Sequence, residues 1–188
     1  MMRDISLHIM DIMQNSTRVE ANNIGLMLEI DREKDILYVT ISDDGCGMSE
    51  DFISKVISPF TTTRTTRNIG LGIPMFKLSG EICGGGFDIK SKVGEGTSIT
   101  AFYIISNIDR LPLGDIGDTL TGTIMSYPEL RYKLELLGGN EDFIFDTDEI
   151  KKQLGDVPLT EFEVVNWMKE YINENVVSAF RGILKEVG

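Results

Sequence analysis

The stretch Ile41–Met48 constrains the chain most, because an alternating apolar run breaks there into a carboxylate and two glycines. Residues 36–42 alternate apolar and polar side chains, which predicts a strand with one buried face. The strand brings Asp43 to a sharp turn, which Gly45 and Gly47 can form at little steric cost. A carboxylate acceptor beside residues without side chains suits a flat ring with an amino group, such as adenine. Alone, the same pattern is also typical of an ordinary Asp-Gly turn.

Composition restricts the class of protein. The chain has 188 residues, of which 41% are hydrophobic, so it can bury one core and a small appendage. It contains no apolar run of membrane-spanning length and no signal-peptide pattern, and two cysteines argue against a disulfide framework, so we expect a cytoplasmic location. The net charge of −12 argues against a general nucleic-acid or anionic-membrane binder. The acidic excess is larger after residue 106 than before it.

Residues 4–17 are predicted to form an amphipathic helix, and its apolar face consists of Ile5, Ile9, Ile12 and Met13. Asp11 and Asn15 are four residues apart and therefore share one side of this helix. One interpretation is a solvated polar stripe. The functional interpretation is that Asn15 offers an amide oxygen to Mg²⁺, while Asp11 orients or deprotonates a group that attacks the terminal phosphate. We expect His8 to be structural or exposed rather than catalytic.

Residues 59–72 are rich in hydroxyl side chains and end in Gly70-Leu71-Gly72, ahead of a predicted helix at 73–82. A helix N-terminus flanked by glycines presents free N–H groups and the positive end of the helix dipole, which favour phosphate. Arg64 and Arg67 add charged donors. The alternative is a flexible linker with a glycine turn.

The pattern as a whole predicts a helix layer on one face of a mixed sheet. Strands are expected at 24–31, 36–42, 87–91 and 97–105, and a short helix at 49–57. We divide the chain into residues 1–106 and an acidic α+β extension at 107–188 whose function is unassigned. The extension is predicted to hold a helix at 115–127, a hairpin at 132–145, a helix capped by Thr147, and a last helix to about residue 185. The apolar face expected for this last helix consists of Phe162, Val165, Trp167, Met168, Ile172, Val176 and Phe180.

Five motifs in order resemble the ATP-binding domain shared by sensor histidine kinases, DNA gyrase B, Hsp90 and MutL (GHKL), most closely that of histidine kinases. Asn15 matches the N box, and Asp43-x-Gly45-x-Gly47 matches the G1 box. The remaining motifs are Pro59-Phe60 with Thr62-Thr63-Arg64, which is similar to P-F-x-T-T-K, Gly70-Leu71-Gly72 (G2), and Gly94-Glu95-Gly96-Thr97 (G3).

The resemblance implies a Bergerat-type α/β (α+β) two-layer sandwich, with a mixed, mostly antiparallel sheet. It implies that Asp43 binds the adenine amine with help from Thr97, that Asn15 binds Mg²⁺, and that residues 59–69 form a lid. The implied ATP-binding residues are Asn15, Asp43, Gly45, Gly47, Met48, Phe60, Thr62, Thr63, Arg64, Arg67, Gly70, Leu71, Gly72 and Thr97.

The chain departs from the family pattern in three ways. Hydrolysing relatives have glutamate where this chain has Asp11, and Arg64 replaces the usual lysine. The phosphoacceptor hairpin that precedes the domain in sensor kinases is missing, so we do not expect autophosphorylation in cis.

We therefore expect an Mg-ATP-binding protein that phosphorylates or regulates a separate protein partner, with Asp11 as the catalytic residue. The alternatives are an ATP-dependent conformational switch and a slow ATPase working as a homodimer. The acidic residues after 106 form either a solvated surface or a docking face for that partner.

Overall fold

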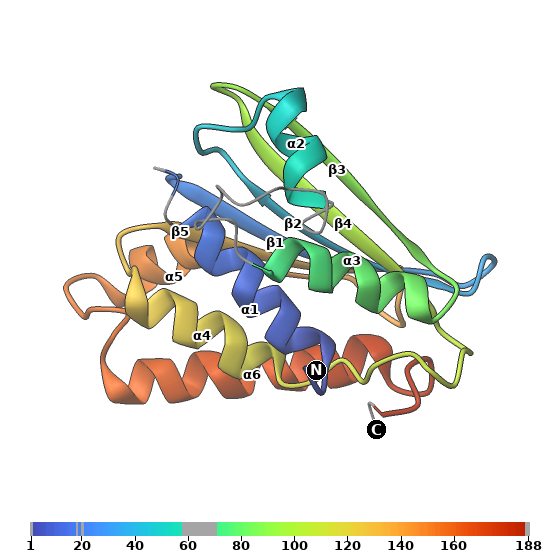
Figure 1. Ribbon diagram of the computed structural model, residues 1–188. Coiled ribbons are helices and arrows are strands. Elements are labelled where there is room, and N and C mark those ends of the chain that lie inside the picture. The colour runs from blue at the N-terminus through green and yellow to red at the C-terminus, as the bar shows by residue number, and fades with distance from the viewer. Residues whose placement is uncertain (1, 18, 20, 58–70, 187–188) are drawn as a thin grey trace.

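The computed structural model describes residues 2–17, 19, 21–57 and 71–186. These residues build one six-stranded sheet in the order β3-β4-β2-β1-β5-β6 (Figure 1). Neighbouring strands are antiparallel except β1 and β5, which are parallel. The strands are β1 (Asn23–Asp31), β2 (Ile36–Asp43), β3 (Gly86–Lys92), β4 (Gly96–Ile104), β5 (Arg131–Leu137) and β6 (Phe143–Asp146).

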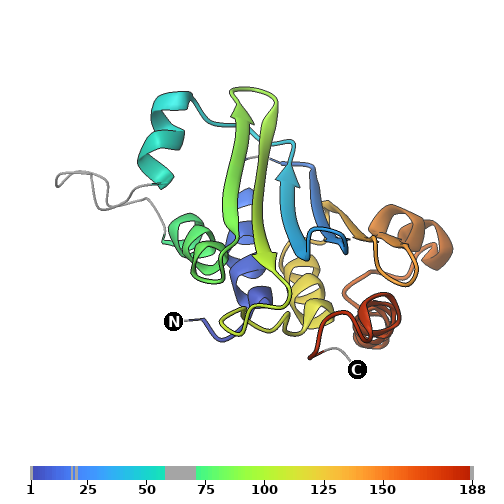
Figure 2. The same ribbon diagram turned by 90° about the vertical axis from the view of Figure 1, so that its right-hand side faces the viewer.

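The helices gather on one side of the sheet, as the turned view shows (Figure 2). They are α1 (Ile5–Ser16), α2 (Glu50–Ile57), α3 (Gly72–Ile82), α4 (Ile116–Ser126), α5 (Thr147–Leu154) and α6 (Phe162–Phe180). Helix α1 packs between α3 and α4, and α6 packs against α4. The predicted fold class, a mixed and mostly antiparallel sheet with a helix layer, is confirmed.

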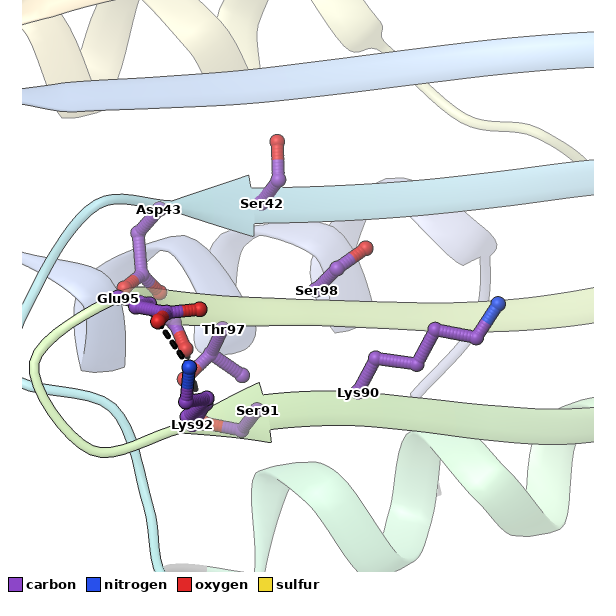
Figure 3. A pocket seen from close by; sticks show the side chains of 9 residues that line it. Ser42, Asp43, Lys90, Ser91, Lys92, Glu95, Thr97 and Ser98 are labelled. Carbon is purple, nitrogen blue, oxygen red and sulfur yellow. Dashed lines mark hydrogen bonds and ion pairs between the residues drawn. The ribbon is translucent and has the colours of Figure 1, made fainter.

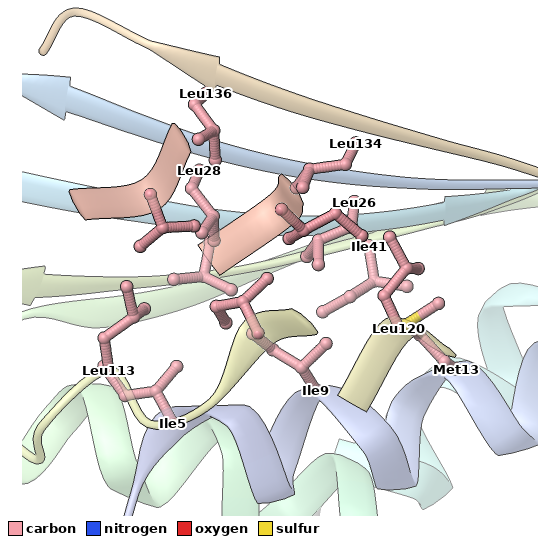
Figure 4. Close-up of a cluster of buried hydrophobic side chains, with 14 of the residues drawn as sticks. Ile5, Ile9, Met13, Leu26, Leu28, Ile41, Leu113, Leu120, Leu134 and Leu136 are labelled. Carbon is pink, nitrogen blue, oxygen red and sulfur yellow. The ribbon is translucent and has the colours of Figure 1, made fainter. Parts of the chain in front are cut away.

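Strand alternation separates the core from the second face of the sheet. Leu26 and Leu28 of β1 are buried, and the intervening Met27 is half-buried. Figure 4 shows Ile5 and Ile9 of α1 among the buried leucines of the sheet. Burying such a side chain contributes roughly 1.5–3 kcal/mol relative to leaving it exposed. No helix of the described residues lies over the face that carries Met27, and we call it the open face.

Residues after 106 extend this same sheet. Strand β5 lies between β1 and β6, and Leu134 and Leu136 of β5 belong to the common core. The C-terminal end is held by Arg110, whose guanidinium donates two hydrogen bonds to the Glu186 carboxylate, at 2.6 and 2.8 Å. The predicted hairpin is present, and it joins the sheet of the first 106 residues. The division into two domains stays a prediction.

The last helix is shorter than predicted. It ends at Phe180, because Arg181 is extended (φ −54°, ψ 130°) and Gly182 has φ +75°. Two aromatic residues expected on its buried face, Phe162 and Trp167, are exposed instead, at 74% and 44%.

The cap of α5 also differs from the prediction. The Asp146 carboxylate accepts from the Asp148 N–H at 3.0 Å and caps the helix, which begins at Thr147. The Thr147 hydroxyl accepts from the Tyr132 N–H at 2.9 Å and so ties α5 to β5.

Candidate functional site

The centre of the site is Asp43, the last residue of β2. One carboxylate oxygen, Oδ2, accepts from the hydroxyl of Ser16 at 2.7 Å, and the other, Oδ1, accepts from the N–H of Gly45 at 3.0 Å. Ser16 is the last residue of α1 and is 4% exposed. Each carboxylate oxygen can accept more than one hydrogen bond, so Asp43 is fixed in orientation and still able to bind a further donor.

The turn after Asp43 depends on the two glycines that the sequence singled out. Gly47 has φ +66°, and a Cβ there would lie 2.0 Å from the carbonyl oxygen of Lys92. A Cβ on Gly45 would lie 2.5 Å from the carbonyl oxygen of Val19. The turn is therefore packed between the segment after α1 and the hairpin of β3 and β4, and neither position has room for a side chain.

Two hydroxyls extend the polar edge from Asp43. Thr97 of β4 pairs with Asp43 on one side and with Ser91 of β3 on the other, and Figure 3 shows the three side chains at the strand ends. Ser91 Oγ accepts from the Met48 N–H at 2.8 Å and donates to the Gly96 carbonyl at 2.9 Å. Because the only hydroxyl proton of Ser91 is used, Thr97 must donate in the 2.8 Å contact between the two hydroxyls. Thr97 Oγ1 therefore keeps its acceptor lone pairs.

A cavity of about 380 Å³ opens beside Asp43 on the helix side of the sheet. Its polar wall comes from α1 and from the ends of β2 and β4, through Asn15, Ser16, Asp43 and Thr97. The other wall is mostly apolar and includes Ile12, Val19, Met48, Phe52, Val56, Ile73 and Ile99. A few convergent polar groups in an apolar cavity of this size are typical of small-molecule sites.

The N-terminus of α3 reaches the same region. Gly72 begins the helix, and a Cβ placed on it would lie 3.4 Å from Asp11 Cβ and 3.6 Å from Asn15 Nδ2. Leu71 precedes it as N-cap without a side-chain hydrogen bond to the helix. The first N–H groups of a helix have no partner within the helix and can donate to a ligand. The structure thus brings together Asp11, Asn15 and the glycine-flanked helix start.

Asp44 has a different role from its neighbour Asp43. Its carboxylate accepts from the N–H groups of Asn22 and Asn23, at 2.7 and 2.8 Å, and from the Asn23 side-chain amide at 2.6 Å. Some loss of hydration opposes ionisation, but these hydrogen bonds outweigh it and lower the pKa of Asp44. Asp44 therefore fixes the start of β1 rather than offering an acceptor to the cavity.

His8 is buried, at 2% exposure, one helical turn before Asp11. Burial lowers its pKa, against the opposing effect of Asp11 and Asp4. Among the described residues, nothing forms a hydrogen bond with its Nδ1 atom. We expected His8 to be either structural or exposed. Its burial excludes the exposed alternative and is consistent with the structural one.

The predicted set of ligand-binding residues stays a prediction, and the structure adds two residues to it. Six predicted residues lie outside the described part of the chain: Phe60, Thr62, Thr63, Arg64, Arg67 and Gly70. The sequence reasoning missed Ser16 and Ser91. Ser16 gives no signal beyond following Asn15, whereas Ser91 was detectable as a hydroxyl at the inward position that Phe87 and Ile89 occupy earlier in the strand.

Comparison with known proteins places this geometry in a family. Residues 3–106 match the family described as "Histidine kinase-, DNA gyrase B-, and HSP90-like ATPase". The sensor histidine kinase WalK of Bacillus subtilis is 28% identical over 86 residues, covering 43% of this chain and 14% of WalK. The sensor protein DegM of a Bacillus species is 31% identical over 93 residues, and SrrB of Staphylococcus aureus is 30% identical over 95 residues.

These matches cover 48% and 47% of this chain, and only 24% of DegM and 16% of SrrB, so the chain spans less than a quarter of these relatives. None of the described helices is both long enough and apolar enough to cross a membrane. The family match covers more than half of the chain, and the chain therefore belongs to the histidine kinase-, gyrase B- and HSP90-like ATPase family, with an ATP-binding domain at residues 3–106.

Proposed function

We propose that this chain binds Mg-ATP in the cavity beside Asp43 and transfers the terminal phosphoryl group to a separate protein. The single observation that carries the proposal is the position of Asp43. It is anchored by Ser16 and Gly45 at the wall of a 380 Å³ cavity, with acceptor capacity left for a ligand amine. Family membership names the ligand as ATP.

The adenine would lie at the Asp43 end of the cavity. Its exocyclic amine would donate to the Asp43 carboxylate, directly or through a water that Thr97 also holds. The flat ring would contact the apolar wall, where Met48 and Ile99 lie on the side of the sheet. Gly45 and Gly47 let the turn pack against Val19 and Lys92, and a larger residue at either position would displace the turn that follows Asp43.

The phosphates would then lie toward α3. The N–H groups that begin α3 at Gly72 favour anions, and they lie next to Asp11 and Asn15. Asn15 would offer its amide oxygen to Mg²⁺, and the metal when bound would neutralise charge on the transferring phosphoryl group. Asp11 would accept the proton of the attacking hydroxyl or water.

Two other outcomes fit the same cavity. Asp11 is one methylene shorter than the glutamate of hydrolysing relatives, which favours ATP binding without efficient hydrolysis and hence a conformational switch. Slow hydrolysis to free phosphate is the third candidate.

The experiment is incubation with ATP radiolabelled in the γ-phosphate, for the chain alone and with a cell lysate. The control is Asp43→Asn, which removes the proposed adenine contact. Label that moves to a lysate protein with the wild type and not with the control supports the kinase. Free phosphate alone indicates an ATPase, and ATP binding without either product indicates a switch. No measurable ATP binding by calorimetry would overturn the whole proposal.

A further inference from the structure

The open face of the sheet carries two adjacent rows of side chains that run across five strands and continue onto β6, where Asp146 lies beside Lys133 and Ile144 beside Glu135. The register places Lys90, Ser98, Ser42, Gly25 and Lys133 in one row, which we call the lysine row. It places Asp88, Thr100, Thr40, Met27 and Glu135 in the next, which we call the acidic row. Figure 3 shows Lys90, Ser98 and Ser42 of the lysine row along their three strands.

Within the first five strands, each row has a charged residue on β3 and on β5 and uncharged residues between them. The Asp146 carboxylate on β6 accepts hydrogen bonds from Arg131. Lys90 forms an ion pair with Asp88 at 3.5 Å, and Lys133 forms one with Glu135 at 3.0 Å. The residues of the two rows on these five strands therefore carry no net charge, in a chain whose net charge is −12. A net charge of this size makes two copies of the chain repel each other on average, and these two rows do not add to that repulsion.

The two rows are complementary to each other, and this makes the open face complementary to itself. A two-fold axis that runs parallel to the rows and midway between them lays the lysine row of one copy over the acidic row of the other. Lys90 then faces Asp88 of the second copy, and Lys133 faces Glu135 of the second copy. An axis through the lysine row would instead place Lys90 over Lys90, and an axis through the acidic row would place Glu135 over Glu135.

We propose that the open face is the dimer interface of this protein, with a second copy of the chain as its occupant. The sheets would pack face to face about 10 Å apart, with strand directions within about 30°. The small residues Gly25, Ser42 and Ser98 allow this approach, and Met27 on β1 supplies an apolar side chain beside them.

The area of the two rows sets the expected strength of the dimer. Four strand spacings separate Lys90 from Lys133, which corresponds to roughly 19 Å. A patch of that width covering the strand lengths is roughly 400–600 Å² per copy, below the about 800 Å² per partner of a standard interface. The dimer is therefore a weak one that dissociates on dilution and in high salt. Both ATP cavities lie on the helix side and stay open.

The experiment uses sedimentation velocity over a range of protein concentrations. Lys133→Glu should weaken the wild-type dimer at least about tenfold, because the introduced glutamate then faces Glu135 of the other copy. Glu135→Lys should do the same with two lysines. A mixture of the two variants should associate to within about threefold of the wild type, because every contact between positions 133 and 135 is then opposite in charge.

The matched control is Lys152→Glu on α5. It breaks an ion pair of the same kind, Lys152–Glu149 at 2.6 Å, away from the open face, and it should leave the dimer unchanged. Circular dichroism of each variant verifies that it is folded. A wild type that stays monomeric at every concentration overturns the proposal. So does a mixture that associates no better than its components.

Discussion

Exchanging Asp43 for asparagine tests whether the anchored carboxylate is the adenine contact. The Oδ1 position accepts from the Gly45 N–H, so the amide nitrogen of the variant cannot lie there without two donors facing each other. The nitrogen must take the Oδ2 position and donate to Ser16 Oγ, which stands 2.7 Å away. The turn keeps its shape, but the negative charge and the acceptor at Oδ2 are lost.

The expected loss of ATP affinity follows from the kind of hydrogen bond that the substitution removes. A hydrogen bond to a charged group contributes about 1.5–3 kcal/mol, so ATP should bind about 10- to 150-fold more weakly to Asp43→Asn. The assay is isothermal titration calorimetry with ATP, together with urea unfolding to verify that stability changes little.

The neighbouring carboxylate provides the control. Asp44→Asn also removes one negative charge, but Asp44 bonds to Asn22 and Asn23 at an exposed position and does not line the cavity. It should lower the free energy of unfolding by only about 0.5–1 kcal/mol and leave ATP affinity within about twofold of the wild type. Equal ATP affinity in Asp43→Asn and wild type would refute the placement of adenine, and so would equal losses in both variants.

Three further predictions concern chemistry, backbone and pH. Asp11→Asn should reduce transfer of label at least about 100-fold while ATP affinity changes less than about threefold, because a general base acts only in the chemical step. Equal losses of transfer rate and of ATP affinity would contradict that role. Gly47→Ala should lower the free energy of unfolding by about 3 kcal/mol or more in urea, because its Cβ would meet the Lys92 carbonyl, whereas Gly94→Ala, at φ +80° with nothing within 4 Å, should cost only about 1 kcal/mol. The single histidine, His8, should make the free energy of unfolding depend on pH, because its pKa in the folded protein lies below 6.5. Its contribution to that free energy is complete above pH 6.5 and is lost as the pH falls and the unfolded chain takes up a proton. Thermal unfolding of His8→Leu should lack this loss between about pH 7 and about pH 5.5, and identical pH profiles would contradict the assignment.

Local pattern predicted the elements well and their partners poorly. The alternation at β2 and the helical spacing at α1 follow from side chains a few residues apart, so these elements could be read directly from the sequence. The insertion of β5 beside β1 depends on pairs such as Leu26 with Leu134. Such a pair joins residues more than a hundred positions apart, and the sequence of neither strand indicates which strand it pairs with.

Burial on α6 shows the same limit in another form. Phe162 and Trp167 are apolar, and spacing alone assigned both to the core, but the helix is covered on only one side. Met168 and Ile172 are fully buried on that side, while Trp167 stacks on Tyr171 at the surface. In the site, Ser16 was missed for a related reason: a serine that ends a helix has no distinctive pattern, and only the fold shows that it faces Asp43.

The two proposals can fail separately, because β2 sends alternate side chains to opposite faces. Asp43 lies in the cavity wall on the helix side, while Ser42 belongs to the lysine row on the open face. No residue of either row lines the cavity, so effects at the two places should add rather than couple. Lys133→Glu should therefore bind ATP within about twofold of the wild type while its dimer weakens. A fall in its ATP affinity of more than about fivefold would contradict this independence of the two sites.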